Sequence, residues 1–504
     1  MSSSVVATET RSTGLLPRFA SGPVGVVVAA QTAVLTVASG WYGFHRDELY
    51  FLAAGKRLDW GYVDQPPITP LLAWLSTTLF SETPSGLRVA STLAGTATVL
   101  LVALVARELG GGRTVQWVSA AAAALSSFVV VTTHMVSTTT FDMLIWVGLG
   151  FVVMRLLRTG DGRWWVLVGA VIGIGLANKW LILMLVSVLA IGVLAVGPRS
   201  VLRSWWLAVG IAVCLALAAP ILIWQAAHDF PLLTVASGIS ADDGAANRVL
   251  FVPMQLVYLS PVLVPVWVAG IVRLWRDPEV RWGRAFAVSY PLLGLELLIL
   301  GGKPYYSVPL LLVLLPAGMP AALAWLTRGR LSLRRGLGGA GAAVGIVMSV
   351  IIGLPALPAS ALNGFVLGVN KEQGEQAGWP EFATTVSSAW QQITPDQRGR
   401  AVILTRNYGQ AGAIEHYGPQ LGLPQPYSGH MSYADWGPPP DHLTGPVLVV
   451  GEIAGQTVIT GCRQVAVHDN GIGLENEEQG TPVRVCDSPA EPWSQVWPKL
   501  RRFY

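Results

Sequence analysis

The sequence is short of charge. Only 12% of its 504 residues are Asp, Glu, Lys or Arg, whereas 52% are hydrophobic and the mean hydropathy is +0.52. Soluble globular proteins carry charge on about a quarter of their residues. The composition therefore excludes an ordinary soluble protein and indicates a polytopic membrane protein.

Several motifs of soluble enzymes are also missing. The sequence contains no Gly-x-x-x-x-Gly-Lys-Ser/Thr phosphate loop, no Gly-x-Ser-x-Gly nucleophile elbow and no Cys-x-x-Cys pair. These absences argue against ATP-driven transport and serine hydrolysis. The net charge of +4 comes from basic residues that stand singly or in pairs between apolar runs. Because no basic stripe alternates with aromatic residues, we exclude nucleic acid as a partner.

Cysteine is rare, with three residues in the whole chain. Cys214 lies inside an apolar run, whereas Cys462 and Cys486 lie in the polar C-terminal tail. If that tail is outside the cytosol, these two residues can form a disulfide.

Long apolar runs dominate the first two thirds of the chain. A polar segment at residues 1–20 comes first, and we expect it to be a disordered cytosolic N-terminus. The runs that can cross ~30 Å of hydrocarbon then predict about 11 transmembrane helices. They lie near residues 22–43, 86–106, 114–133, 140–157, 164–178, 180–197, 205–225, 250–272, 285–301, 305–326 and 337–356. Arginines gather in alternate loops, which places the N-terminus in the cytosol and the C-terminal tail outside.

The composition changes at about residue 357, where charged residues, Gln and Asn replace the long apolar runs. Residues 401–405, 446–450 and 463–469 are predicted strands, and residues 409–418 a helix. Residues 423–441 are so rich in Pro and Gly that we predict a long aromatic loop. The predicted fold is thus an α-helical polytopic membrane domain at 21–356, followed by a small soluble α/β domain at 357–504 on the external side.

The first external loop, residues 44–70, holds an unusual set of polar residues. It begins "GFHRDELYF", with Asp47 and Glu48, and continues to "GYVDQPP", with Asp64 and Gln65. A carboxylate pair at the mouth of a membrane bundle is costly to keep unless it is used. We therefore predict that Asp47 and Glu48 are catalytic; a solvated helix cap is the alternative.

Further ionisable residues are predicted on the same outer side. Asp142 lies just inside the outer end of the fourth span, where it either pairs structurally or tunes Asp47, with or without a shared divalent cation. Lys179, between the fifth and sixth spans, suits an anion such as phosphate, or simply snorkels to the interface. A cationic and aromatic patch is predicted from Lys303, Tyr305 and Tyr306.

These features together resemble the C superfamily of membrane glycosyltransferases (GT-C). The resemblance rests on the Asp–Glu loop, "GYVDQPP", the basic residue between the fifth and sixth spans, "KPYY" before the tenth span and the C-terminal domain. It is strongest for family 39-like enzymes of the protein mannosyltransferase and aminoarabinose transferase group, of actinobacterial type. It implies a polyprenyl-phosphate-linked sugar donor, an acceptor hydroxyl on a glycan, lipid or protein, and transfer at the outer face of a bacterial plasma membrane.

The resemblance also implies roles for single residues. Asp47 matches the acidic residue that acts as the catalytic base, Glu48 stands beside it, and Asp142 matches a second acidic position. The basic residues expected near the donor phosphate are Lys179, Lys303 and Arg46. The residues expected to bind substrate are Asp64, Gln65, Tyr305 and Tyr306. A single displacement would invert the anomeric configuration, and no cofactor is required, although Asp47 and Asp142 are compatible with a divalent metal ion.

Two functions of other classes also fit a chain with many spans. A secondary transporter or lipid flippase usually holds its charges near the midplane, in broken helices and paired repeats. In this sequence the ionisable residues gather at one predicted face, and no matching halves are visible. A membrane-anchored binding protein would leave residues 44–70 unexplained. The sequence favours the glycosyltransferase, but it identifies neither the sugar nor the acceptor.

Overall fold

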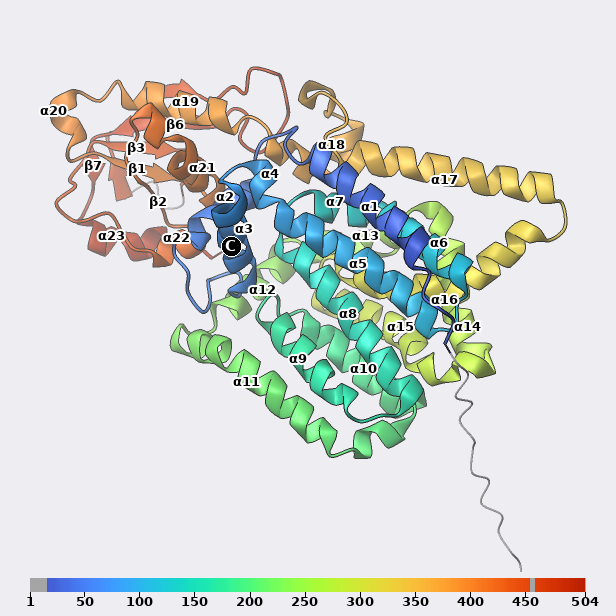
Figure 1. Ribbon diagram of the computed structural model, residues 1–504. Helices are drawn as coiled ribbons and strands as arrows, with labels where there is room; N and C mark the ends of the chain where they lie inside the picture. The colour runs from blue at the N-terminus through green and yellow to red at the C-terminus, as the bar shows by residue number, and fades with distance from the viewer. Residues whose placement is uncertain (1–15, 454–457, 504) are drawn as a thin grey trace, which may run out of the picture.

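The protein is described by a computed structural model, which covers residues 16–453 and 458–503 (Figure 1). Most of the predicted N-terminal segment 1–20 therefore lies outside the described residues. The helices as far as residue 353 form a bundle, and the sheets lie beyond one end of it (Figure 1). This arrangement confirms the predicted fold class of a polytopic helical protein with a small α/β region.

Seven helices in the described part of the chain are long and apolar enough to cross a membrane, or nine if each of two bent pairs is one span. The long helices are α1 (Ser21–Ala38), α5 (Val89–Glu108), α8 (Thr138–Thr159), α11 (Trp206–Ala227), α15 (Arg284–Leu300), α16 (Val308–Thr327) and α17 (Leu331–Gly353). Two shorter apolar helices, α9 (Trp164–Leu176) and α10 (Ile182–Val196), pack among them. Each of the predicted spans coincides with one of these helices or bent pairs.

Two predicted spans are broken. The run 114–133 forms α6 (Arg113–Ala124) and α7 (Ser127–His134), which meet at 59°. The run 250–272 forms α13 (Gly244–Val257) and α14 (Val264–Arg276), bent by 77°. At the second break Ser260 has a φ of 135°, and Pro261 has no N–H to continue the helical ladder. The prediction of continuous spans is wrong here because hydropathy shows how long an apolar run is but not where the helix that it forms will bend.

The segment predicted as the first external loop is largely helical. It contains α2 (Arg46–Gly55) and the start of α3 (Ile68–Phe80), and it is followed by α4 (Pro84–Leu87). His45 caps α2 through a capping box with Glu48, so the polar run that begins this segment is also what starts the helix. One further short helix, α12 (Pro231–Asp242), lies between the spans α11 and α13.

The C-terminal region is built on a five-stranded sheet in the order β2-β1-β3-β6-β5. Its strands are β1 (Val402–Thr405), β2 (Pro426–Ser428), β3 (Val447–Val450), β5 (Arg463–Val467) and β6 (Pro482–Cys486); β4 (Ile459–Thr460) and β7 (Ser488–Pro489) form a separate pair. β1 is parallel to β2 and β3, and β6 is antiparallel to both of its neighbours. The helices here are α18 (Phe365–Val369), α19 (Trp379–Trp390), α20 (Pro395–Arg398), α21 (Tyr408–Tyr417), α22 (Ser432–Asp435) and α23 (Trp493–Leu500).

The predicted strands and helix in this region match β1, β3, β5 and α21, but the predicted loop at 423–441 is wrong. It contains β2 and α22. β2 is an edge strand that begins at Pro426, and a proline is tolerated there because its missing N–H costs no ladder bond. A disulfide joins Cys462 to Cys486, whereas Cys214 is a free thiol.

The C-terminal region and helix α2 share one apolar core. Phe44, Leu49 and Tyr50 are buried in the same cluster as Ile403 and Ile414. The approach of α2 to α21 is close, because a Cβ at Gly412 would lie 3.0 Å from backbone atoms of Leu49. The sheet region is therefore fixed against the segment that carries the predicted catalytic residues.

Candidate active site

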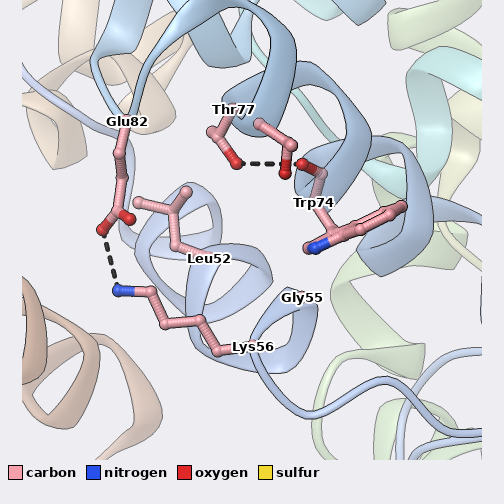
Figure 2. Close-up of a pocket in the computed structure, with 7 residues that line it drawn as sticks. Leu52, Gly55, Lys56, Trp74, Thr77 and Glu82 are labelled. Carbon is pink, nitrogen blue, oxygen red and sulfur yellow. Dashed lines mark hydrogen bonds and ion pairs between the residues drawn. The ribbon is translucent and has the colours of Figure 1, made fainter.

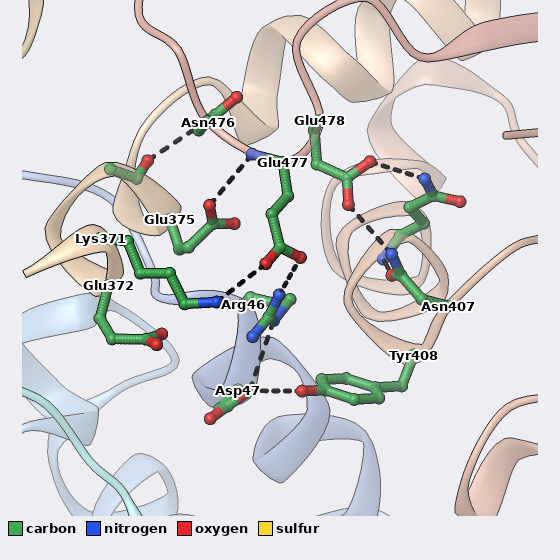
Figure 3. A network of polar contacts seen from close by, with 12 residues as sticks. Arg46, Asp47, Lys371, Glu372, Glu375, Asn407, Tyr408, Asn476, Glu477 and Glu478 are labelled. Atoms are coloured by element: carbon green, nitrogen blue, oxygen red, sulfur yellow. Dashed lines mark hydrogen bonds and ion pairs between the residues drawn. The ribbon is translucent and has the colours of Figure 1, made fainter. Parts of the chain in front are cut away.

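Asp47 lies in the first turn of α2 and faces the C-terminal region (Figure 3). The Tyr408 hydroxyl, at the start of α21, donates a hydrogen bond of 2.7 Å to Asp47 Oδ1. The Arg46 Nε atom lies 3.6 Å from the same oxygen. Asp47 Oδ2 makes no hydrogen bond to any residue in 16–453 or 458–503, so one face of the carboxylate is free.

Arg46 does not point toward the predicted donor site. Its guanidinium forms an ion pair with Glu477, from the C-terminal region, in addition to its contact with Asp47 (Figure 3). The neighbouring His45 ring lies 3.1 Å from Glu372. The positive charge of Arg46 is thus used to hold α2 to the C-terminal region, and the geometry does not support its predicted contact with a donor phosphate.

Glu48 is separated from Asp47 and completely buried. Its carboxylate accepts hydrogen bonds from Arg88 Nε (2.9 Å) and Nη2 (2.8 Å), and both side chains are 0% exposed. The backbone N–H groups of His45 and Val136 donate two more bonds, at 2.8 and 2.9 Å. Each Glu48 oxygen therefore has two donors, and the carboxylate has no free face for chemistry. The predicted catalytic pair consists of one accessible and one structural carboxylate.

Asp64 connects the Asp47 region to the rest of the segment. The Tyr50 hydroxyl donates to Asp64 Oδ1 at 2.6 Å, and the rings of Tyr50 and Tyr408 lie 4.8 Å apart. Burial raises the pKa of Asp64 to about 6, although the Tyr50 hydrogen bond opposes the shift. Repulsion by the Asp47 carboxylate also raises the pKa of Asp64, but it contributes less than burial does.

The segment after Asp64 is attached to the turn between α9 and α10. The backbone N–H of Ile68 donates to Ala177 O at 3.0 Å, and the Thr69 hydroxyl donates to Asn178 Oδ1 at 3.0 Å. Asn178 in turn donates to Thr138 O at 2.9 Å, at the start of α8. These bonds place the predicted substrate-binding segment directly beside Lys179.

Lys179 is a cation without a close carboxylate. Its ammonium lies 5.0 Å from the ring centre of Tyr306 and 5.9 Å from that of Tyr305, and it contacts the Thr139 hydroxyl at 3.3 Å. Among the described residues it forms no ion pair within 4.0 Å, although it attracts the Asp142 carboxylate over a longer distance. Four of the predicted site residues, Asp142, Lys179, Tyr305 and Tyr306, therefore form one group.

Two of the predicted site residues are buried and have polar side-chain atoms without hydrogen-bond partners. Gln65 is 1% exposed and Asp142 5% exposed. Neither the side-chain amide of Gln65 nor Asp142 Oδ1 has a hydrogen-bond partner among the described residues. Buried polar groups are normally paired, so unpaired ones require an explanation such as a bound ligand.

Lys303 is engaged elsewhere. Its ammonium lies 3.8 Å from Asp243, in the segment that joins α12 to α13. Although Tyr305 and Tyr306 follow it closely in sequence, it is their rings that reach Lys179, whereas Lys303 is paired with another acid. The structure thus brings Lys179 but not Lys303 to the candidate site.

The donor set does not fit a metal ion. In the two described ranges of the chain, no three His, Cys, Asp or Glu side chains converge so that they could hold one. The free oxygen of Asp47 and the unpaired oxygen of Asp142 are not supplemented by a third ligand of these types. The mechanism proposed below uses no metal.

Two comparisons bear on this arrangement. The family model for dolichyl-phosphate-mannose-protein mannosyltransferases matches residues 64–224. The structure is similar to that of ArnT from Cupriavidus metallidurans bound to undecaprenyl phosphate, with a TM-score of 0.58 and 15% identity over 92% of this chain and 98% of that chain. This likeness shows that the chain has the fold of the ArnT structure. Apo ArnT matches the chain with a TM-score of 0.55 and 14% identity, over 93% and 98% of the two chains.

Other structural matches are weaker. Arabinofuranosyltransferase AftD from Mycobacteria has a TM-score of 0.48 and 14% identity, over 93% of this chain and 40% of that chain. No curated protein matches the sequence. At these identities the likeness establishes the fold, and the function has to be inferred from the site.

Three residues of the site were missed at the level of the sequence. Tyr408 contacts Asp47 from 361 residues away, Arg88 neutralises Glu48, and Tyr50 holds Asp64. Arg88 stands singly at the start of an apolar run, where it reads as a boundary residue. Tyr408 belongs to "NYGQAGAIEHYG", a stretch that signals a helix but carries no mark of its distant partner.

Proposed function

We propose that this chain is a GT-C glycosyltransferase, which transfers a sugar from a polyprenyl-phosphate-linked donor to an acceptor hydroxyl at the outer face of a bacterial plasma membrane. The observation that carries the proposal is the group of unpaired, buried polar atoms on Gln65 and Asp142 beside Lys179. A bound sugar phosphate would supply hydrogen-bond partners for the amide and the carboxylate and an anion for the ammonium. The arginines that gather in alternate loops favour an orientation in which this site and the C-terminal region lie outside.

The donor end of the proposed site is formed by Lys179, Tyr305 and Tyr306. The ArnT structure contains undecaprenyl phosphate, and this chain shares its fold over nearly the whole length. On the proposal, Lys179 stabilises the negative charge that develops on the departing phosphate, and the two rings keep its ammonium in place. Gln65 and Asp142 hold hydroxyl groups of the donor sugar.

Asp47 is the proposed base at the acceptor end. Its free Oδ2 accepts the proton of the acceptor hydroxyl as the acceptor oxygen bonds to the anomeric carbon. In the same step the bond between that carbon and the phosphate oxygen breaks, and the phosphate leaves with the electron pair. A single displacement of this kind inverts the anomeric configuration. Tyr408 acts as a positioning residue, because its hydrogen bond fixes the other oxygen of Asp47.

The test is a transfer assay with purified protein in lipid nanodiscs. A panel of synthetic polyprenyl-phosphate sugars, each labelled in the sugar, is incubated with wild type, Asp47→Asn and Asp161→Asn. Asp161 is an exposed acid that caps a short turn after α8, so its amide variant controls for the loss of one surface charge.

We expect one donor to be transferred or slowly hydrolysed by wild type and by Asp161→Asn, with a loss of at least ~100-fold in Asp47→Asn, the lower end of the range for general acid–base catalysis. If every donor stays intact, the proposed function is wrong and a lipid flippase is tested next. If Asp47→Asn is as active as wild type, the proton is accepted by another group.

A further inference from the structure

A cavity of about 210 Å³ lies at the far end of α2 from Asp47 (Figure 2). Helix α2 contributes Leu52 and Gly55 to its lining, and Lys56 directly follows the helix. Helix α3 contributes Trp74 and the two residues of a polar pair, Thr77 and Thr78. Glu82, beyond the end of α3, completes the rim. None of these residues takes part in the site described above.

The size of the cavity limits what it can bind. Pockets for drug-sized ligands usually measure ~300–1,000 Å³. A cavity of about 210 Å³ therefore admits a single small ring and not an extended molecule. The remainder of a larger ligand would have to leave through the open side, where Trp74 is 43% exposed.

The lining has the chemistry of a sugar-binding site. The exposed indole of Trp74 offers a flat apolar face to the C–H groups of a sugar ring. The Thr77 hydroxyl donates to Ala73 O at 2.9 Å and keeps its lone pairs free as acceptors. The Thr78 hydroxyl makes no hydrogen bond to any described residue, so it is free to donate and accept. An apolar wall with a few convergent polar groups is the usual composition of a specific small-molecule site.

The rim of the cavity is charged but electrically balanced. Lys56 Nζ lies 2.8 Å from Glu82 Oε1, and the His416 ring of α21 approaches the same oxygen at 2.9 Å. The hydrogen bond from His416 is the main cause that lowers the pKa of Glu82 to about 2, so this group is ionised at physiological pH. A lipid acyl chain would have to desolvate these charges, which is unfavourable. Because the charges compensate each other, a neutral polar ligand is favoured over an ion.

The position of the cavity relates it to the acceptor. Asp47 is the second residue of α2, and Lys56 directly follows the last. Nine residues of α-helix rise ~14 Å, at ~1.5 Å per residue. A ligand that reaches both ends of α2 therefore has to contain more than one sugar unit.

We propose that this cavity binds one neutral sugar unit of the acceptor glycan, at a distance from the hydroxyl that reacts. The assignment of that unit to the acceptor rests on the proposed function, whereas the binding of a sugar rests on the cavity alone. Glycans that carry such a unit are preferred over single-sugar acceptors.

The test measures binding without transfer. The full-length Asp47→Asn protein in nanodiscs is titrated with neutral disaccharides of mannose, arabinose and galactose, and binding is followed by saturation-transfer NMR. We expect at least one disaccharide to bind. Adding Trp74→Ala should weaken that binding at least ten-fold, Trp74→Phe should restore most of it, and Trp41→Ala should leave it unchanged. Trp41 is the control because it is also an exposed tryptophan, at 62% against 43% for Trp74, and lies outside the cavity.

A second variant keeps the test sharp if Trp74→Ala does not fold. Thr78→Trp places a bulky side chain at an exposed helix position and fills the cavity, so binding should be lost while the protein remains folded. The inference is wrong if no disaccharide binds, or if both Trp74→Ala and Thr78→Trp bind as Asp47→Asn does. The binding assay contains no donor, so the two proposals can fail separately. If every donor stays intact in the transfer assay but a disaccharide binds to Asp47→Asn, the proposed function is wrong and the sugar site remains supported.

Discussion

Arg88 neutralises Glu48, the buried carboxylate beside Asp47 that takes no part in the proposed reaction. Arg88 and Glu48 are both fully buried, so Arg88→Met leaves a negative charge without a partner in the protein interior. Breaking a buried pair of this kind typically costs ~3–5 kcal/mol. Thermal unfolding in detergent should therefore occur at a clearly lower temperature than in wild type. The exposed pair of Arg501 and Asp435 provides the control, because Arg501→Met should cost less than ~1 kcal/mol. Equal losses in the two variants would contradict the structural role of Arg88.

Tyr408 should matter for turnover and not for donor affinity. Tyr408→Phe removes the hydroxyl that holds Asp47 and leaves the ring contact with Tyr50 intact. Hydrogen bonds to charged groups are worth ~1.5–3 kcal/mol, which corresponds to a ~10–100-fold loss of kcat. The Michaelis constant for the donor should be unchanged, because Lys179 and its neighbours are untouched. A raised donor KM with normal kcat would show instead that Tyr408 contributes to the donor site.

Glu375 is the residue from which we expect a dependence of stability on pH. It is 3% exposed, its Oε2 has no partner in the described residues, and burial raises its pKa from 4.5 to about 7. Above pH ~4.5 the unfolded state releases this proton, whereas the folded state keeps it until about pH 7. The contribution of Glu375 to the free energy of unfolding is thus fully present below pH ~4.5 and is lost as the pH rises through about 7.

Glu375→Gln should remove that loss. The amide keeps an acceptor for the Glu477 backbone N–H, which lies 3.1 Å from Glu375 Oε1. The variant should match wild type below pH ~4.5 and exceed it by up to about 3 kcal/mol above pH 7, because the pKa rises from 4.5 to about 7 and each tenfold difference in proton affinity is worth ~1.36 kcal/mol. Unfolding curves recorded between pH 4 and pH 8 provide the measurement. Parallel curves over this range would mean that Glu375 does not titrate.

At the scale of elements, the close approach of α2 and α21 depends on the absence of a side chain. Gly412→Leu would drive a side chain against the Leu49 backbone, and overpacking of this kind typically costs ~1–3 kcal/mol. Gly339→Leu is the matched control, because a Cβ at this glycine of α17 meets nothing within 4 Å. Gly412→Leu should lower both thermal stability and transfer activity, whereas Gly339→Leu should lower neither. If both variants behave alike, the contact between the two helices is not tight in solution.

The elements show how far sequence alone could go. Apolar runs predicted where helices lie because burial in lipid or protein requires long hydrophobic stretches. They could not predict the bends before Ser127 and at Ser260, because these depend on contacts such as the bond of 2.8 Å from Phe128 N to Tyr258 O. In the same way β2 was missed because an edge strand of three residues needs only one parallel neighbour.

The residues of the candidate site also fall into those that the sequence could predict and those that depend on distant contacts. Asp47, Asp64, Gln65, Asp142 and Lys179 were predicted because polar groups at the edge of a membrane bundle are costly and therefore conspicuous. Glu48 was assigned to catalysis because the sequence contains no sign that Arg88, 40 residues away, would neutralise it. Adjacent positions on a helix point in different directions, so neighbours in sequence need not share a role.

At the scale of the whole molecule, transfer should require both the helical bundle and the C-terminal region, held together by their contacts. Tyr408 and Glu477 reach the first turn of α2 from the C-terminal region, and Leu49 and Tyr50 are buried in a core with Ile403 and Ile414. Cleavage between α17 and α18 by an inserted protease site should therefore leave the two pieces associated and active until denatured. Dissociation of the pieces on cleavage, with activity in the first piece alone, would contradict this dependence.

The same contact has a consequence for biogenesis. Asp47 emerges from the ribosome 361 residues before Tyr408. At a synthesis rate of ~5–20 residues per second, this delay amounts to about 20–70 s. During that time the apolar face of α2 has no partner, and the proposed base is not held in position. On the proposed function, a newly made molecule therefore reaches full activity only after the C-terminal region has folded onto α2, so an incomplete copy in the membrane would transfer sugar slowly.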